Sequence, residues 1–185
     1  MVQLSFASFN VRGLCNPNKR SIIFKKLEHY DISFLQETYV TDNKISAWRL
    51  DWKGEIIYHP GTNNSKGMMI LFKRNVFDST STFYSSERVL GLKAVINGEE
   101  YFFINVYGTS EDKARPAFYN QLYNVINLCS SKNIIIGGDF NIVMDNKLDI
   151  VSGKKHDEVF IQMFNNWVTR KKPCGLLEGF TSRNN

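Results

Sequence analysis

Short apolar runs recur along this chain, and stretches with helical periodicity or turn-forming residues separate them. The clearest run, Asn133–Gly137, contains three successive isoleucines and is typical of a buried strand. Strands that alternate with amphipathic helices fold as layers, because each helix buries its apolar stripe against a sheet. The pattern predicts a mixed α/β domain, and 185 residues are enough to enclose a sizeable core.

The expected elements follow from periodicity and turn signals. Asn97-Gly98, the strongest short hairpin signal, lies between two apolar runs, and Pro116 suits the first turn of a helix. No internal repeat, low-complexity tract or linker interrupts the pattern, so we expect one domain over residues 1–185. We expect strands at residues 4–9, 32–35, 55–58, 68–72, 92–96, 101–107 and 133–137, and helices at 19–30, 116–129 and 157–170.

Two of the expected helices have a predicted buried face. In helix 19–30 we expect Ile22, Ile23, Leu27 and Tyr30 to point inward. The stripe of helix 157–170 consists of Val159, Phe160, Met163, Phe164, Trp167 and Val168.

The composition indicates which class of partner and which cellular compartment to expect. The formal charge of +5 and the pI of 9.1 favour a polyanionic partner, because Lys and Arg that neutralise phosphates release condensed counterions. No run reaches the roughly 18 apolar residues that span a bilayer, and the first residues lack the pattern of a secretory signal, so we expect no membrane contact and no secretion. Cys15, Cys129 and Cys174 are far apart, which favours free thiols in a reducing compartment, nuclear or cytoplasmic.

Polar residues directly follow several of the expected strands. They are Asn10, Glu37, Tyr107, Asp139 and Asn141. Ligands bind at the carboxyl ends of strands in an α/β sheet, so these side chains are candidates for one shared site. Two carboxylates and two amides form an oxygen-rich set that suits Mg²⁺, which prefers few carboxylates, several waters and a substrate phosphate.

Each candidate also has a simpler interpretation. An Asn after a strand often forms a turn, a Glu there is often solvated, and a Tyr there is often a strand-end aromatic. The segment Gly137–Asn141 is more specific, because its glycines allow a tight turn and its alternation sends Asp139 and Asn141 to one face. We expect His29, His59 and His156 to be surface residues.

Four short motifs occur in order: Ser-Phe-Asn-Val-Arg-Gly from residue 8, Leu-Gln-Glu-Thr from residue 35, Asn-Val-Tyr-Gly from residue 105 and Gly-Gly-Asp-Phe-Asn from residue 137. They resemble the successive motifs of the exonuclease–endonuclease–phosphatase superfamily, in the form found in the endonuclease domain of LINE-type retrotransposons. The resemblance extends over residues 3–182. It implies a four-layer α/β sandwich of the DNase and abasic-endonuclease type, with two mixed β-sheets facing each other and helices outside.

The resemblance also implies roles for the candidate residues. Mg²⁺ or Mn²⁺ would bind at Glu37 with help from Asn10, Tyr107 would contact the scissile phosphate, Asp139 would orient or deprotonate the attacking water, and Asn141 would hold a phosphate oxygen. The reaction would nick DNA and leave a 3′ hydroxyl that primes reverse transcription, with the reverse transcriptase region of the same polyprotein as a further partner. Candidates for contact with the nucleic-acid backbone are Arg12, Lys19, Arg20 and Arg115.

The end of the chain departs from the family pattern. Cys174–Glu178 resembles a "GL-D" segment and Gly179–Ser182 resembles the start of a threonine–tryptophan strand, but no later residue matches the family's closing Asp and His. We therefore expect a C-terminally truncated domain without its last strands, impaired nicking, and self-association through exposed sheet edges. The alternatives are a non-catalytic retroelement remnant that binds metal, nucleic acid or protein, and a phosphatase of small phosphate esters.

Overall fold

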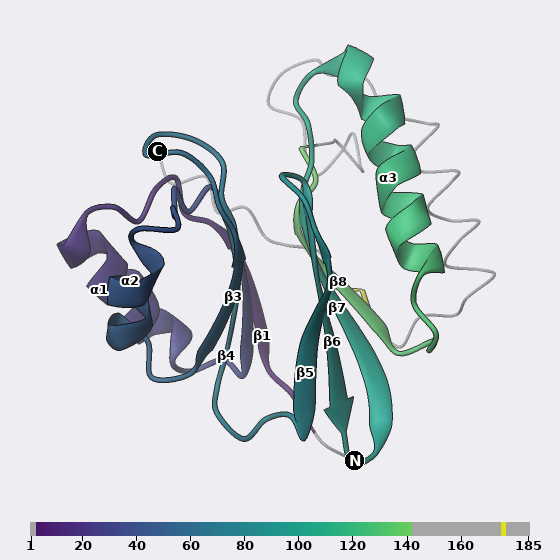
Figure 1. Ribbon diagram of the computed structural model, residues 1–185, viewed down its shortest axis with the longest axis horizontal. Helices are drawn as coiled ribbons and strands as arrows, with labels where there is room; N and C mark the ends of the chain where they lie inside the picture. Colours follow the sequence, from purple (N-terminus) through teal and green to yellow (C-terminus); the bar gives the residue numbers. More distant parts are fainter. Residues whose placement is uncertain (1–2, 142–174, 177–185) are drawn as a thin grey trace, which may run out of the picture.

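Two β-sheets face each other, and helices cover their outer faces (Figure 1). This computed structural model describes residues 3–141 and 175–176. The four-stranded sheet has the order β1-β2-β4-β3, and the five-stranded sheet has the order β5-β6-β7-β8-β9. The four-stranded sheet and its helices comprise β1 Phe6–Asn10, α1 Pro17–Leu27, β2 Ile32–Gln36, α2 Ile45–Asp51, β3 Glu55–His59 and β4 Met68–Phe72.

The five-stranded sheet follows in the chain, with helix α3 on its outer side (Figure 1). Both sheets are mixed, because each combines parallel and antiparallel pairs. The parallel pairs are β1 with β2 in the first sheet, and β7 with β8 and β8 with β9 in the second. The predicted four-layer sandwich with two mixed sheets is confirmed. The second set of elements comprises β5 Ser79–Ser85, β6 Val89–Ile96, β7 Glu99–Tyr107, the 3₁₀ turn Asp112–Ala114, α3 Arg115–Asn127, β8 Ile134–Asp139 and β9 Gly175–Leu176.

The predicted strands and hairpin are largely confirmed. The β6–β7 hairpin turns at Asn97 and Gly98, whose φ angles of 51° and 80° suit the turn that this dipeptide favours. The sequence prediction missed α2, β5 and the short strand β9, and it began the first helix too late. The predicted helix 157–170 lies outside the described residues, and no helix of the described part is long and apolar enough to span a membrane.

The buried face of α1 differs from the prediction. Ile22 and Tyr30 are exposed, at 58% and 39%, and Tyr30 lies beyond the end of the helix. The helix starts at Pro17 because Asn16 caps it, accepting hydrogen bonds from two backbone N–H groups. Its inward face consists of Arg20, Phe24 and Leu27. The prediction of inward Ile22 and Tyr30 is therefore wrong, because an arginine that is paired in the interior occupies this face.

Strand β2 is buried on both faces and joins two parts of the core. Ile32 and Phe34 pack between the sheets, whereas Leu35 packs toward the helices of the first sheet. Alternation along the strand sends Gln36 to the same inter-sheet face as Ile32 and Phe34. A polar side chain on this face requires a hydrogen-bond partner in the core.

Asn105 of β7 supplies that partner from the opposite sheet. Gln36 Nε2 donates to Asn105 Oδ1 at 2.7 Å, and Asn105 Nδ2 donates to the carbonyls of Leu35 and Met69 at 3.0 and 2.9 Å. Gln36 is 1% exposed and Asn105 is fully buried. These three bonds form a directional link across an otherwise apolar interface, so they fix the register of one sheet against the other.

We predict that Asn105→Ala lowers the free energy of unfolding by about 3 kcal/mol, because it leaves buried carbonyl and amide groups without partners. Urea unfolding followed by circular dichroism measures the loss. Asn124→Ala, on the exposed side of α3, is the matched control and should change stability by less than about 0.5 kcal/mol. Equal stability of the two variants would contradict a structural role for the amide link.

Candidate active site

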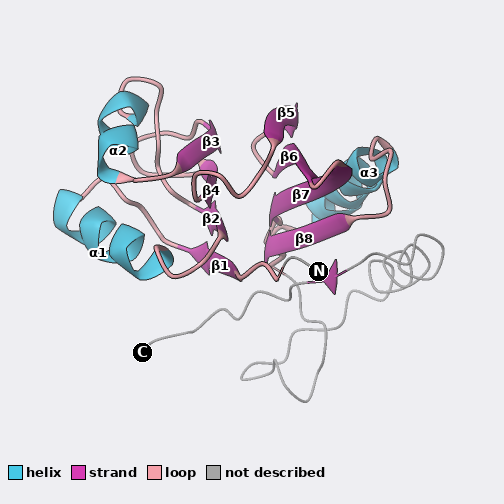
Figure 2. Cartoon of the chain, turned by 90° about the horizontal axis from the view of Figure 1, so that it is seen from below, coloured by secondary structure: helices cyan, strands magenta, loops and turns pink. Residues whose placement is uncertain are grey.

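Two parallel strand pairs, one from each sheet, end at the same rim of the sandwich. In the first sheet Asn10 of β1 stands opposite Gln36 of β2, and in the second Tyr107 of β7 stands opposite Asp139 of β8. The view in Figure 2 shows β1 and β8 near each other across the sandwich, and the two strands are in contact. The carboxyl ends of four strands therefore converge at one place.

The amide of Asn10 links the two sheets at this rim. Its Nδ2 donates to Glu37 Oε1 and to Asp139 Oδ2, each at 2.9 Å. The hydroxyl of Tyr107 donates to the same Glu37 oxygen at 2.9 Å. The prediction that these residues cluster at one rim is confirmed, because a single amide nitrogen contacts both carboxylates.

Asn141 completes the predicted cluster. Its backbone N–H donates to Asp139 Oδ1 at 3.1 Å, and its Nδ2 donates to the carbonyl of Gly108 at 3.0 Å. The left-handed φ of 53° turns the chain at this residue, directly after the strand that carries Asp139. Both oxygens of Asp139 thus accept a hydrogen bond, and its carboxylate is held in a fixed orientation.

Glycines allow the ends of β7 and β8 to approach closely. A Cβ at Gly138, where φ is 153°, would lie 2.0 Å from the carbonyl oxygen of Val106. A Cβ at Gly108 would lie 1.9 Å from the carbonyl oxygen of Phe140. The glycine in each of these two motifs is therefore required for the backbone contact that brings Tyr107 and Asp139 together.

The backbone at Glu37 is held from two sides. The carbonyl of Glu37 accepts from Gly13 N at 2.6 Å, while Thr38 N donates to Gly67 O and Tyr39 N donates to Lys66 O, each at 3.0 Å. Glu37 itself has a left-handed φ of 53°, a strained conformation for a residue with a side chain. The loops after β1 and before β4 thus impose the direction in which the carboxylate points.

Tyr39 is a site residue that the sequence prediction missed. Its hydroxyl lies 3.5 Å from Glu37 Oε2, and its ring packs so closely on Gly13 that a Cβ there would lie 2.6 Å from it. Burial raises the pKa of the Tyr39 hydroxyl, and the nearby Glu37 carboxylate adds to this effect. The only sequence signal was its position two residues after Glu37.

The hydroxyl of Tyr107 stays protonated at physiological pH. Burial raises the pKa of Tyr107 to about 12, and the hydrogen bond to Glu37 and the charge of that carboxylate act in the same direction. The guanidinium of Arg88 opposes the increase in pKa. Tyr107 is therefore a neutral hydrogen-bond donor at physiological pH.

Neutral groups alone hold the two carboxylates. None of the ion pairs in the described part of the chain includes Glu37 or Asp139, and that part contains no cluster of three or more His, Cys, Asp or Glu side chains that could hold a metal. Two converging carboxylates that form no ion pair with a Lys or Arg of the described residues favour a bound cation. One or two carboxylates are also what Mg²⁺ takes from a protein when waters and a phosphate supply the other ligands.

The four predicted nucleic-acid contacts have different surroundings. Arg12 is exposed beside the site, and Lys19 is exposed in α1, where its Nζ donates to the carbonyls of Val11 and Arg12 at 2.7 and 3.0 Å. Arg115 is at the start of α3, paired with Asp112 at 3.0 Å, and only 17% of its side chain is exposed.

Arg20, in contrast, is buried. Its guanidinium pairs with Asp51 at 2.7 Å, donates to the carbonyl of Leu14 at 3.0 Å and lies over the ring of Trp48. These contacts attach α1 to α2 and to the loop after β1. We therefore correct the prediction for Arg20, because its charged group is engaged in the interior rather than presented to a nucleic acid.

Sequence comparison relates the chain to a family and to a transposon protein. Residues 7–148 match the profile of the endonuclease/exonuclease/phosphatase family. Over 149 residues, 77% of this chain, the sequence is 32% identical to the transposon TX1 uncharacterized 149 kDa protein of Xenopus laevis. The chain spans only 11% of that protein's length.

Solved structures share the fold at low sequence identity. The endonuclease domain of TRAS1, a telomere-specific non-LTR retrotransposon, is 13% identical with a TM-score of 0.63, over 91% of this chain and 72% of that one. An AP endonuclease from Archaeoglobus fulgidus is 21% identical with a TM-score of 0.62, over 81% and 62%. The 3′ phosphatase NExo from Neisseria, bound to a product DNA hairpin, is 21% identical with a TM-score of 0.67, over 90% and 71%.

We predict that Gly138→Ala costs at least about 3 kcal/mol of stability, because it adds a backbone clash to backbone strain. Gly98→Ala is the matched control: its φ is 80° but nothing lies within 4 Å of the added Cβ, so it should cost only about 1 kcal/mol. Urea unfolding of both variants measures the difference. Equal losses would show that β8 does not need the close approach to β7.

Proposed function

This chain belongs to the endonuclease/exonuclease/phosphatase family, and from that membership we propose that it nicks DNA by metal-dependent hydrolysis of a phosphodiester bond. The observation that carries the proposal is the amide of Asn10, which joins a carboxylate of each sheet, Glu37 and Asp139, at the convergent strand ends. A site that holds two carboxylates together, with neither of them in an ion pair of the described residues, suits a phosphate bridged to the protein by a divalent cation.

Mg²⁺ or Mn²⁺ would be held by Glu37, and when bound it stabilises negative charge on the phosphoryl group and on the leaving oxygen. Asn10 presents its amide nitrogen to both carboxylates, and its Oδ1 accepts from Arg12 N at 3.2 Å. In this orientation Asn10 aligns the carboxylates, and it would ligate a cation only after its amide rotates. We therefore assign the direct ligand role to Glu37 and a supporting role to Asn10.

Asp139 accepts the proton of the attacking water. As the water oxygen forms a bond to phosphorus, the bond from phosphorus to the 3′ oxygen breaks. The leaving 3′ oxygen takes a proton from solvent, and the product is a 3′ hydroxyl beside a 5′ phosphate. The hydrogen bonds from Asn10 and Asn141 hold the carboxylate in one orientation, and a positioned base of this kind contributes about 10²–10⁴-fold to the rate. The hydroxyl of Tyr107 and the side-chain amide of Asn141 are the donors that we assign to the phosphate oxygens.

The biological setting we propose is retrotransposition. The similarity to a transposon protein and the shared fold with a retrotransposon endonuclease domain support DNA as the substrate and a 3′ hydroxyl as the primer for reverse transcription. The reverse transcriptase region of the same polyprotein is then a partner. With this role we also propose a location in the nucleus or the cytoplasm.

One observation favours a second candidate, a non-catalytic retroelement module that binds metal or nucleic acid. No histidine of the described residues bonds to Glu37 or Asp139; His59 instead bonds to Ser85 at 2.9 Å. A histidine could donate a hydrogen bond to the negative charge that develops on the phosphoryl group in the transition state. The loss of one such donor typically lowers the rate by about 10²–10³-fold. This candidate predicts binding of DNA without cleavage.

We predict that the chain nicks supercoiled plasmid in the presence of Mg²⁺ or Mn²⁺ and that EDTA stops the reaction. Glu37→Ala and Asp139→Ala should each lower the rate by about 10²–10⁴-fold, because they remove a metal ligand and a base. Glu28→Ala, which breaks an exposed ion pair on the outer surface, is the control and should leave the rate unchanged. Nicking that survives Glu37→Ala would contradict the proposal, and binding without nicking would support the second candidate.

We predict weak DNA binding with little sequence preference and a steep dependence on salt. Affinity should fall by orders of magnitude between about 50 and 200 mM salt, because backbone contacts release counterions. Arg12→Ala should weaken binding to all sequences and reduce the salt slope by about 1, whereas Lys25→Ala, on the outer face of α1, should not. Fluorescence anisotropy with two unrelated duplexes measures both effects, and tight binding that ignores salt would exclude this mode.

A further inference from the structure

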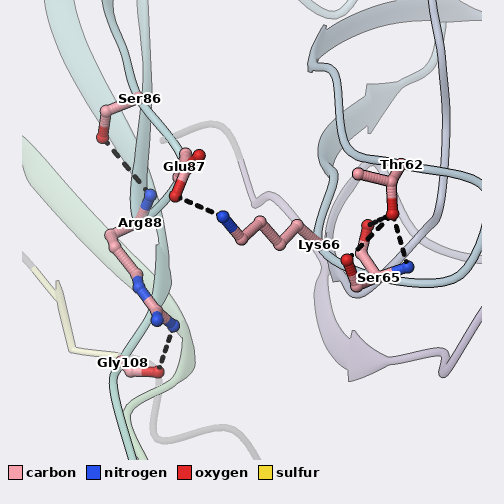
Figure 3. Close-up of polar contacts among 7 residues, drawn as sticks. All are labelled: Thr62, Ser65, Lys66, Ser86, Glu87, Arg88 and Gly108. Carbon is pink, nitrogen blue, oxygen red and sulfur yellow. Dashed lines mark hydrogen bonds and ion pairs between the residues drawn. The ribbon is translucent and has the colours of Figure 1, made fainter.

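Arg88 lies at the rim of the site, in the turn between β5 and β6 (Figure 3). Its guanidinium carbon lies 5.0 Å from the centroid of the Tyr107 ring, and one of its nitrogens donates to the carbonyl of Gly108 at 3.0 Å. Its own carbonyl accepts from the backbone N–H of Tyr107 at 2.9 Å. Arg88 thus contacts the backbone of Tyr107, the face of its ring and the residue that follows it.

The carbonyl of Gly108 connects Arg88 to a second site residue. It also accepts from Asn141 Nδ2 at 3.0 Å, so the guanidinium and the amide share one acceptor. A planar guanidinium can lie on an aromatic face and donate a directed hydrogen bond at the same time, which an ammonium does less well. Arg88 is therefore placed to restrict both Tyr107 and Asn141.

The turn that carries Arg88 is itself held in place. Ser86 Oγ accepts from the backbone N–H groups of Arg88 and Val89 at 3.3 and 3.0 Å. Glu87 pairs with Lys66 of the first sheet's β3–β4 loop at 2.8 Å (Figure 3). Lys66 in turn holds the backbone of Tyr39. The turn is thus tied to the loop that supports Glu37.

We propose that Arg88 is a positioning residue for phosphodiester hydrolysis: it fixes the direction of the Tyr107 hydroxyl, with Asn141 tied to the same support through Gly108. The inference rests on the proposed function for its kinetic consequence. A solvated arginine at the rim would make no such set of contacts, and an arginine that binds substrate phosphate would act on affinity. A positioning residue acts on the rate of the chemical step.

The kinetic test compares Arg88→Ala, Arg88→Lys and the double variant Arg88→Ala/Tyr107→Phe in Mg²⁺-dependent nicking. Arg88→Ala should lower kcat by about 10- to 100-fold, the range expected when a reacting geometry is loosened, with KM and the salt slope of DNA binding little changed. Arg88→Lys should restore part of the rate. In the Tyr107→Phe background, the same Arg88→Ala change should cost at least about threefold less, because residues that act as a unit are non-additive.

The opposite results would overturn the proposal. An unchanged rate, or a loss of the same size in both backgrounds, would show that Arg88 does not act through Tyr107. A raised KM with a reduced salt slope would identify Arg88 as a phosphate contact instead. Arg74→Ala, which removes an exposed arginine on the connection from β4 to β5, is the matched control and should change neither parameter.

A second measurement does not depend on turnover. In protein labelled with ¹³C at the tyrosine rings, Arg88→Ala should shift the Tyr107 resonance and speed its ring flip, and Arg88→Lys should move both back toward wild type. Unchanged Tyr107 signals would refute the positioning role even in a folded variant. If the wild-type chain shows no Glu37-dependent nicking, the proposed function fails, while this measurement still decides whether Arg88 holds Tyr107.

Discussion

The hydrogen-bonded amides of Gln36 and Asn105 determine how the two sheets meet. Apolar packing between sheets is non-directional and allows several registers, whereas a buried amide pair is satisfied in only one. Gln36 directly precedes Glu37, and Asn105 lies two residues before Tyr107. The link that sets the register therefore also brings the carboxylate of one sheet to the hydroxyl of the other, with 2.9 Å between Tyr107 and Glu37 oxygens.

Each sheet donates a hydrogen bond to a carboxylate of the other sheet. Asn10 of the first sheet donates to Asp139 of the second, and Tyr107 of the second donates to Glu37 of the first. Neutral donors hold both carboxylates without cancelling their charge, so the attraction for a cation is retained while the geometry is fixed. Neither sheet alone contains such a site, which is why the chemistry we propose depends on the whole sandwich.

The sequence predicted the parts of this structure that have local signals. Apolar runs located most strands, and the polar residue after each run located Asn10, Glu37, Tyr107 and Asp139. Strand β5, Ser79–Ser85, has no such signal, because its polar residues form a strand only by pairing with β6. The roles of Arg20 and Arg88 likewise could not be predicted from the sequence, since they come from contacts with residues far away in the chain. Sequence patterns indicate which side chains face a core, and tertiary contacts decide which charged groups lie there.

The strained backbone around the site also depends on tertiary contacts. A left-handed conformation in a residue with a side chain costs about 1–3 kcal/mol, and it persists only where surrounding contacts enforce it. Around this site those contacts come from both sheets, since Lys66 supports Tyr39 within the first sheet and pairs with Glu87 of the second. Contacts between the two sheets therefore stabilise these left-handed conformations. If those contacts were weakened, the backbone would relax and the site side chains would lose their orientation. The non-glycine residues with positive φ near the site are Arg12, Glu37, Tyr39, Lys66 and Asn141.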